Sequence, residues 1–410
     1  MSYDVQVFAQ RALSSDDVRI LLGDAGLRVD DEASSASSLT VVRGAQARYS
    51  FTLGLPVPIE AEDVPEEVTA VLLGAAYLYE LMVEGSSATE TPHAVRFARR
   101  LATASDGVVV DQQSGEVWTR GKSRAVPVVQ RGTTDIVKVR WYVPPEGTGA
   151  HAADAWLSLA RRHLPEALPR RFGPVEPLSM KLESDGAGAF VDAVAAETMA
   201  VYYKGTAPCI EGSMAGGAGR PGVHSHGLSV HRGALADPRW REALRCLFVE
   251  FAVTTEAVYA SAEVARGVEW SGRSVGYGPT AERVTYLAAR GTWAGLPPYP
   301  VWWSWFSPEY TLLVRDHLPA DEVVDAGAGM FHGRGGEPLD RGQLTAAIGH
   351  PAEAPRRGLS NLFSRRPTPT SPATWLPAHL LPVVDESDPR LHNPPLTPAM
   401  TMPDCLQSDH

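Results

Sequence analysis

A stretch of twelve residues, 299–310 (YPVWWSWFSPEY), contains six aromatic side chains, and Pro297-Pro298 leads into it. Aromatic side chains bury large areas and dominate both cores and recognition surfaces, so the fold must either enclose this segment or present it to a ligand. Three interpretations are open: hydrophobic core, partner-binding surface, or small-molecule pocket. The last two predict a set of binding residues, which are Tyr299, Trp302, Trp303, Trp305, Phe306 and Tyr310.

The adjacent Trp302 and Trp303 constrain the segment further. Successive side chains of a strand point to opposite faces, so the two rings cannot both enter one core from a strand. We expect one ring to pack inside and the other to be partly exposed or covered by the C-terminal tail. The pair therefore predicts a mixed role, with some rings in the core and others facing the tail or a partner.

The composition is that of a globular protein with an acidic surface. The 410 residues are 44% hydrophobic and 21% charged, with a net charge of −11. Binding of nucleic acid regardless of sequence needs a basic face, so we expect no nucleic-acid partner. The length allows two or three domains of ordinary size.

Cysteine usage and hydropathy indicate a cytoplasmic protein. Cys209, Cys246 and Cys405 are far apart and form no CxxC pair, which is typical of reduced thiols. The N-terminus shows no basic segment followed by an apolar one, so no signal peptide is expected. No run of 18 apolar residues occurs, and we expect no membrane partner.

Residues 1–124 predict an N-terminal α+β module. Period-two alternation indicates strands, and capping residues with helical spacing indicate helices. The strands expected are 3–9, 39–43, 47–53 and 77–84, with a hairpin at 108–118; the helices begin after Ser14, after Pro65 and at Thr91.

Residues 135–319 predict a second α+β module, so the fold class is α+β, with two α/β-sandwich-like modules and antiparallel-rich sheets. The strands expected here are 136–143, 178–183, 201–204, 223–231 and 283–287; the helices are one capped by Asp154, one at 187–197 and a long one from Asp237 to Arg266. A break at Val253-Thr254-Thr255 is the alternative for the long helix.

Residues 320–410 predict an irregular, proline-rich tail. Four arginines lie among Ser, Thr and Pro between residues 354 and 374, which is typical of a disordered linker. The last residues are expected to lie extended over the body of the protein.

The histidines on the expected strand 223–231 are the candidate metal ligands. His224 and His226 are two residues apart and therefore point to one face, where they could bind one metal ion. His231 is expected on the opposite face. No Cys pair, HExxH motif or nearby carboxylate cluster completes a tetrahedral set, and a sheet face that carries two histidines is the alternative.

Other patterns give weaker indications of chemistry. Cys209 could pair with an imidazole of the histidine strand, although no GxSxG or SxxK motif is present. The glycine-rich residues 212–222 lack the Lys-Ser/Thr ending of a P-loop and predict a mobile connection, and no cofactor is expected.

The acidic residues of the long helix, Glu242, Glu250, Glu256 and Glu263, predict its solvated side. Arg170-Arg171 is a candidate binding pair for a carboxylate or phosphate, or else a solvated turn.

The second module resembles a known family. Its tryptophan-bearing strand (VRWYV), proline-rich LPRRFGPVEPL, WWSWF segment and LVRDHLP are similar to bacterial immunity proteins of polymorphic toxin systems, of the type VI immunity-like family and its actinobacterial relatives. The resemblance covers about residues 135–320. It implies a non-enzymatic protein that neutralises a cognate toxin by binding it.

Three functions are compatible with these observations. The preferred one is a non-catalytic protein-binding module, with toxin immunity as its particular form. A structural or assembly component of a larger bacterial complex is the alternative, and self-association into a homo-oligomer stays open. A metal-dependent enzyme that uses His224 and His226 is the third.

Overall fold

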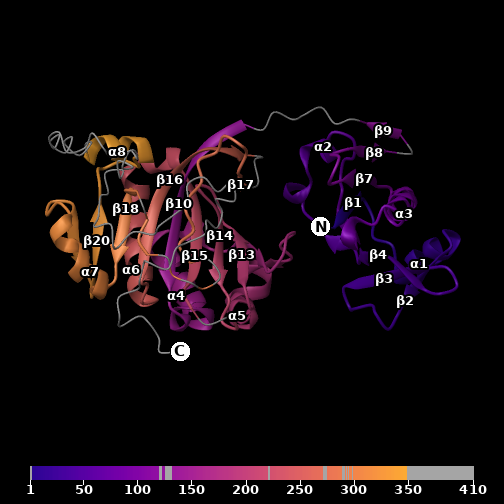
Figure 1. Cartoon of the computed structure of the whole chain (residues 1–410), viewed down its shortest axis with the longest axis horizontal. Helices are drawn as coiled ribbons and strands as arrows, with labels where there is room; N and C mark the ends of the chain where they lie inside the picture. The colour runs from indigo at the N-terminus through magenta and orange to yellow at the C-terminus, as the bar shows by residue number, and fades with distance from the viewer. Residues whose placement is uncertain are drawn as a thin grey trace, which may run out of the picture. The chain divides into compact units, whose positions relative to one another are not determined.

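The computed structural model describes residues 2–119, 122–124, 132–219, 222–270, 275–288, 291, 293, 295–297 and 299–348. The chain divides into two compact units, Met1–Arg131 and Gly132–His410 (Figure 1). Each unit combines helices with one sheet, and the strand pairings in the described part are antiparallel. The predicted α+β class is confirmed.

The first unit is built on a sheet in the order β2-β3-β4-β6-β1-β7-β8-β9, with β5 paired to β6. Its elements are β1 (Tyr3–Ala9), α1 (Ser15–Asp24), β2 (Leu27–Asp30), β3 (Ser38–Arg43), β4 (Arg48–Gly54), β5 (Val57–Pro58), α2 (Glu66–Thr69), β6 (Tyr77–Val83), α3 (Thr91–Ala104), β7 (Val108–Asp111), β8 (Val117–Thr119) and β9 (Lys122–Arg124). Helices α1 and α3 pack on one face, and residues around α2 cover the other.

Local sequence explains the helices of this unit. Ser14 and Asp17 form a capping box, which satisfies free N–H groups at the start of α1. Phe97 and Leu101 lie on the buried side of α3, and Pro92 occupies its first turn, where a missing N–H costs nothing. These signals act within a few residues, which is why the sequence predicts them.

The second unit has a larger sheet, in the order β12-β11-β13-β14-β15-β10-β16-β18-β20-β19, with β17 paired to β16. Its first elements are β10 (Gly132–Val143), α4 (Gly149–His163), β11 (Arg171–Gly173), β12 (Met180–Lys181), α5 (Leu182–Ala196), β13 (Ala200–Lys204), β14 (Cys209–Ala215) and β15 (His224–His231). The others are α6 (Pro238–Thr254), β16 (Tyr259–Trp270), β17 (Val275–Gly276), β18 (Trp303–Phe306), α7 (Pro308–Val314), β19 (Val323–Ala326), β20 (Gly329–Gly333) and α8 (Arg341–Ile348).

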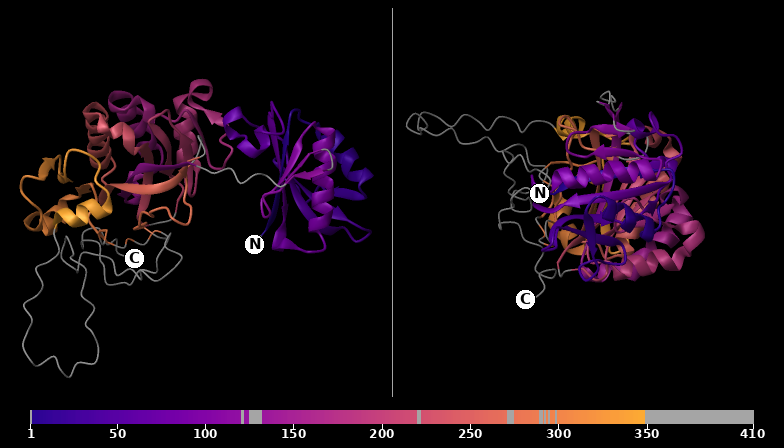
Figure 2. Two further views of the ribbon diagram at one scale, coloured as in Figure 1. Left: turned by 90° about the horizontal axis from the view of Figure 1, so that it is seen from above. Right: turned by 90° about the vertical axis from the view of Figure 1, so that its right-hand side faces the viewer.

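Helices α4, α5 and α6 cover one face of this sheet (Figure 2). Val137, Val139 and Trp141 alternate along β10 and point into that helical layer. Trp141 donates its Nε1–H to the Phe248 carbonyl oxygen at 2.9 Å, so its polar atom is satisfied inside the core. The intervening residues of β10 face the opposite side, which is polar at its centre.

The long helix predicted from Asp237 to Arg266 is wrong in its second half. Helix α6 ends at Thr254, and Tyr259–Trp270 form strand β16 beside β10. The β-branched residues at 253–255 weaken the helix, and Glu256 takes a left-handed conformation with φ 50° that ends it. Glu263, expected on a solvated helix, is therefore buried in the sheet.

Four other predictions need correction. Residues 320–348, expected in an irregular tail, include β19, β20 and α8, and the first two extend the sheet. No strand forms at 283–287; among 178–183 only Met180–Lys181 pair as a strand before α5 starts. The loop expected at 212–222 begins only after Ala215, because β14 runs to that residue. The linker predicted at 354–374 lies outside the described residues.

Candidate functional site

The aromatic segment lies inside the second unit. Trp302, Trp303, Trp305, Phe306 and Tyr310 are all buried, and Tyr299 is half-buried. On β18 the rings of Trp303 and Trp305 face the helical layer, whereas Phe306 packs on the other side of the sheet with Tyr259. Burial removes these rings from the surface, so a partner reaches them only if the core opens.

Neither Trp302 nor Trp303 is partly exposed, and the alternative of coverage by the C-terminal tail falls on residues 349–410, outside the described residues. Their rings stack with centroids 3.9 Å apart, and both belong to the same core cluster. Strand β18 begins at Trp303, so Trp302 lies before the strand and is not bound by its alternation. A change of backbone direction at that point lets both rings enter one core.

The two arginines of the pair Arg170-Arg171 differ in exposure. Arg170 is exposed, whereas Arg171 is buried and its Nε donates to the Leu178 carbonyl oxygen at 3.0 Å. Arg171 is the first residue of β11, and Arg170 directly precedes the strand. The structure therefore gives Arg171 a bond within the protein at the place where a bound carboxylate or phosphate was predicted.

His226 holds neighbouring backbone segments together. Its Nδ1 accepts from the Ala215 N–H at 3.0 Å, and its Nε2 donates to the Gly147 carbonyl oxygen at 2.9 Å. Burial lowers the pKa of His226 to about 4, so the imidazole is neutral. Both ring nitrogens are used, and a metal ion would have to break one of these bonds.

His224 lies on the same strand, two residues before His226. In the described part of the chain, His, Cys, Asp and Glu side chains form no group of three or more that could hold a metal ion. Cys209 is buried, and burial raises its pKa far above that of a free thiol. The register places Cys209 opposite Val230, four residues beyond His226, so a thiol–imidazole pair is not formed.

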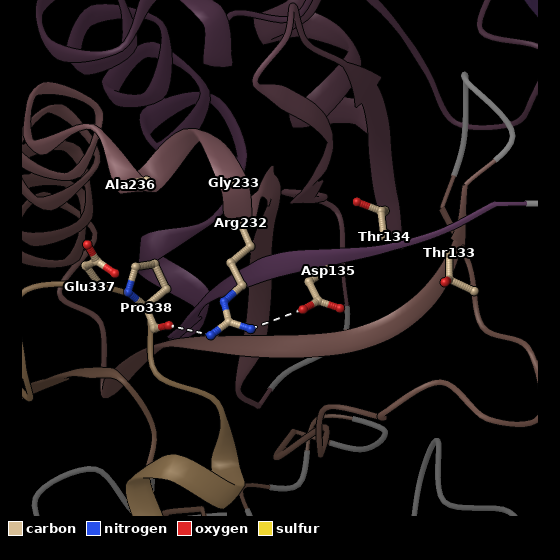
Figure 3. A pocket seen from close by; sticks show the side chains of 8 residues that line it. All are labelled: Thr133, Thr134, Asp135, Arg232, Gly233, Ala236, Glu337 and Pro338. Carbon is tan, nitrogen blue, oxygen red and sulfur yellow. Dashed lines mark hydrogen bonds and ion pairs between the residues drawn. The ribbon is translucent and has the colours of Figure 1, made fainter.

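A cavity of about 500 Å³ lies beside the start of β10 (Figure 3). Arg232 crosses it and donates to Asp135 Oδ2 at 3.1 Å and to the Pro338 carbonyl oxygen at 2.9 Å. Asp135 Oδ1 also accepts from the Gly267 N–H at 3.1 Å. Arg232 and Asp135 thus satisfy each other inside the cavity, and the exposed Glu337 adds a negative charge to its lining.

The face of the second sheet that points away from α4–α6 carries a row of polar side chains. Cross-strand pairing aligns one residue from each of six neighbouring strands: Arg171, Lys204, Glu211, Ser229, Lys138 and Glu263. Residues directly opposite on adjacent strands have neighbouring side chains, so the row is continuous. No stretch of sequence contains this row, because it is assembled from six separate strands.

The charges in this row are unequally partnered. Lys204 Nζ lies 3.3 Å from a carboxylate oxygen of Glu176 and 3.3 Å from one of Glu211. Lys138 Nζ donates to Ser229 Oγ at 2.8 Å. Burial, with the nearby Arg140 cation, lowers the pKa of Lys138 to about 8. The surroundings of Lys138 therefore disfavour its charged form.

Glu263 stands on the other side of Lys138 in the row. Burial raises its pKa to about 7, although Arg341 and Arg140 act in the opposite direction. The Arg341 guanidinium is 3.8 Å from the Glu263 carboxylate and lies over the Tyr299 ring at 3.4 Å. Tyr299, a predicted binding residue, thus borders the polar face.

A smaller cavity of about 300 Å³ opens over part of this face. Its lining residues are Lys138, Glu176, Tyr202, Tyr203, Lys204, Glu211, Gly212 and Ser213. This cavity was not predicted from the sequence. The strand IVKVRWYV indicates a polar face, since Lys138 and Arg140 alternate with apolar residues.

The opposite end of the same sheet has an apolar surface. Leu312 and Leu313 of α7 are 86% and 43% exposed, and Val324 of β19 is 55% exposed. Strand β19 is the last in the sheet order, and an ion pair between Arg315 and Asp325 links it to the end of α7. We name this surface the α7–β19 edge; it comprises Leu312, Leu313 and strand β19.

Comparisons with known proteins give little further information. No protein-family model matches the sequence, and no curated protein is significantly similar to it. A solved structure described as "Pseudomonas aeruginosa T6SS protein PA0821" aligns with 13% identity and a TM-score of 0.37, over 51% of this chain and 67% of that chain. A TM-score this low does not establish a shared fold. None of the helices in the described ranges is long and apolar enough to cross a bilayer.

Proposed function

We propose that this protein is a non-catalytic binding protein that recognises another protein through the α7–β19 edge. The observation that carries the proposal is the combination of a terminal strand with exposed apolar side chains on and beside it. A terminal strand presents backbone N–H and C=O groups to which a partner strand can pair, and apolar side chains next to it supply contact area.

The aromatic segment supports this edge from inside. Tyr310 is buried on α7, and its hydroxyl accepts from Trp293 Nε1 at 2.8 Å. Leu312 and Leu313 follow directly in the sequence and point outward. The segment that sequence analysis selected thus anchors α7, while the residues after it provide the surface.

The particular role we propose is neutralisation of a toxin by direct binding, which the resemblance of residues 135–320 suggests. The net charge of −11 would favour encounter with a basic partner. A structural component of a larger bacterial assembly is the alternative, since it would use the same kind of surface.

The experiment compares partner binding by the wild-type chain and by a double variant, L313K/V324K. Both residues are exposed, so the variant is expected to fold, while two charges oppose an apolar interface. A protein captured by the wild type is purified and titrated against each chain. We expect the double variant to bind at least about 10-fold more weakly. The control is I20K, because Ile20 is 63% exposed in the first unit.

Three outcomes would contradict the proposal. These are a wild-type chain that binds no protein, equal binding by L313K/V324K, and a wild-type homodimer that the double variant dissociates. Co-expression distinguishes the two roles. A toxin-neutralising protein restores growth of cells that express its partner, and the double variant does not.

A further inference from the structure

We propose that the polar face of the second sheet holds an anion site for a small organic carboxylate, which binds between Lys138 and Arg140. The site is separate from the α7–β19 edge and does not depend on the function proposed for it. Both cations come from β10, and they lie on the same face because they are two residues apart. Their Cα atoms are about 7 Å apart along the strand.

Neither cation has a carboxylate in ion-pair contact among the described residues, although Glu211 acts on Lys138 and Glu263 on Arg140 from a longer distance. Among the described residues, Arg140 has neither a hydrogen bond nor an ion pair, and its Nε is buried without a partner. Its guanidinium instead lies over the Tyr286 ring at 4.9 Å. Lys138 has its hydrogen bond to Ser229 but, in the same described part, no carboxylate in ion-pair contact. A buried or half-buried charge without a counter-ion is unfavourable, and a bound anion would relieve that cost.

The neighbouring Lys204 provides the contrast. It is paired with both Glu176 and Glu211 on the same face. The sheet therefore brings carboxylates into ion-pair contact with Lys204, whereas Glu211 and Glu263 lie near Lys138 and Arg140 without such contact. This arrangement is expected where the missing carboxylate belongs to a ligand.

There is space beside the two cations for a ligand. Gly227 of β15 is paired with Arg140 of β10 on one side and with Ser213 of β14 on the other. A Cβ atom at Gly227 would come to 3.2 Å from Ser213 Oγ, so the glycine keeps this part of the face open. The cavity of about 300 Å³ is lined by Lys138, Ser213 and Tyr202 among others. That volume is at the lower end for small-molecule sites. Arg140 is not part of its lining but is connected to Ser213 through Gly227 in the register of the sheet.

The surrounding charges select a monoanion. Glu176 and Glu211 line the same cavity, and Glu263 of β16 is directly opposite Lys138 of β10. These carboxylates would repel a phosphate dianion more strongly than a carboxylate with one charge. A planar carboxylate also matches the fork of an arginine side chain. Tyr202, which is 46% exposed in the cavity lining, offers a ring to an apolar or aromatic group of the ligand.

The test uses benzoate as the probe, with acetate and inorganic phosphate for comparison, and measures affinity by calorimetry on the full chain. We expect benzoate to bind, acetate more weakly, and phosphate most weakly. The variants K138M and R140M should each weaken benzoate binding about 10-fold, since each removes one charged hydrogen bond. K181M is the matched control, because Lys181 is exposed on β12 of the same unit.

Gly227→Ala leaves every charge of the site unchanged and tests whether a ligand needs the free space next to Gly227. Its new methyl group occupies the space beside Arg140, so benzoate binding should fall although folding is preserved, as circular dichroism and thermal unfolding would verify. The proposal is overturned if none of the anions binds, if phosphate binds more tightly than benzoate, or if folded G227A and K138M both bind like the wild type.

Discussion

Single residues of this protein gain their properties from distant partners rather than from their neighbours in the chain. Glu90 is an example in the first unit. It is buried, and its two carboxylate oxygens accept from Nε and Nη2 of Arg43, at 2.7 Å each. Ser50 donates a third bond at 3.0 Å. The Arg43 guanidinium, with Ser50, lowers the pKa of Glu90 to about 2, although burial acts against this.

This depressed pKa predicts acid sensitivity of the first unit. Glu90 favours folding above its ordinary pKa of 4.5, and this contribution is lost as pH falls from there to about 2, because the unfolded chain binds a proton first. E90Q should lower the free energy of unfolding at pH 7 by about 3 kcal/mol. It should also flatten the pH dependence between these values, which urea unfolding at several pH values would measure.

The control is D31N. Asp31 pairs with Arg19 on the surface, where solvent screens the charges, so its loss should leave the stability almost unchanged. Equal effects of E90Q and D31N would show that the buried pair has no special role.

At the scale of elements, β18 shows how one strand joins two layers of the second unit. Its odd and even positions face opposite sides of the sheet, so Trp305 packs under the helices and Phe306 packs on the other side. The neighbouring strands β16 and β20 hold it in register. Side chains of β18 therefore contribute to the hydrophobic cores on both faces of the sheet.

Trp305→Ala should therefore destabilise the second unit by roughly 3–5 kcal/mol, because it leaves a large cavity. W305F should cost less, since a ring remains and the indole N–H, which has no hydrogen-bond partner in the described part, is removed. Leu312→Ala, at an exposed position of α7, is the control and should change the stability very little. Chemical denaturation compares the three variants; a W305A chain as stable as the wild type would contradict this packing.

Sequence analysis at this scale succeeded where signals are local. Strand 3–9, strand 223–231 and the Ser14 capping box were predicted correctly, because alternation and capping are written in adjacent residues. The alternative break at Val253-Thr254-Thr255 is where α6 ends, but strand β16 beyond it was missed, since its Glu263 fits a helix surface as well as a strand. β19 and β20 were missed because they are short and lack strong alternation; they form by pairing with β18 and each other.

At the scale of the whole molecule, each unit has its own hydrophobic core. The sequence predicted modules at 1–124 and 135–319, and we propose two domains with the wider limits Met1–Arg131 and Gly132–His410. Separate cores favour separate cooperative unfolding.

Calorimetry should accordingly record two unfolding transitions. E90Q should lower the temperature of one, and W305A that of the other, because Glu90 is buried in the first unit and Trp305 lies in the core of the second. A single transition that both substitutions shift would mean that the units unfold together.

The sequence by itself determined the α+β class, many strands, and the starts of α1, α2, α3 and α6. It did not determine the starts of α4 and α5, which begin at Gly149 and Leu182 rather than after Asp154 and at residue 187. It did determine the alternation of Lys138 and Arg140 with apolar residues along β10. Tertiary structure alone decided what those two cations face. Ser229, Glu211 and Glu263 reach Lys138 through cross-strand register, which depends on pairing between segments far apart in the chain. It also decided that the aromatic segment is core, since burial is a property of the packed layers and not of the residues alone.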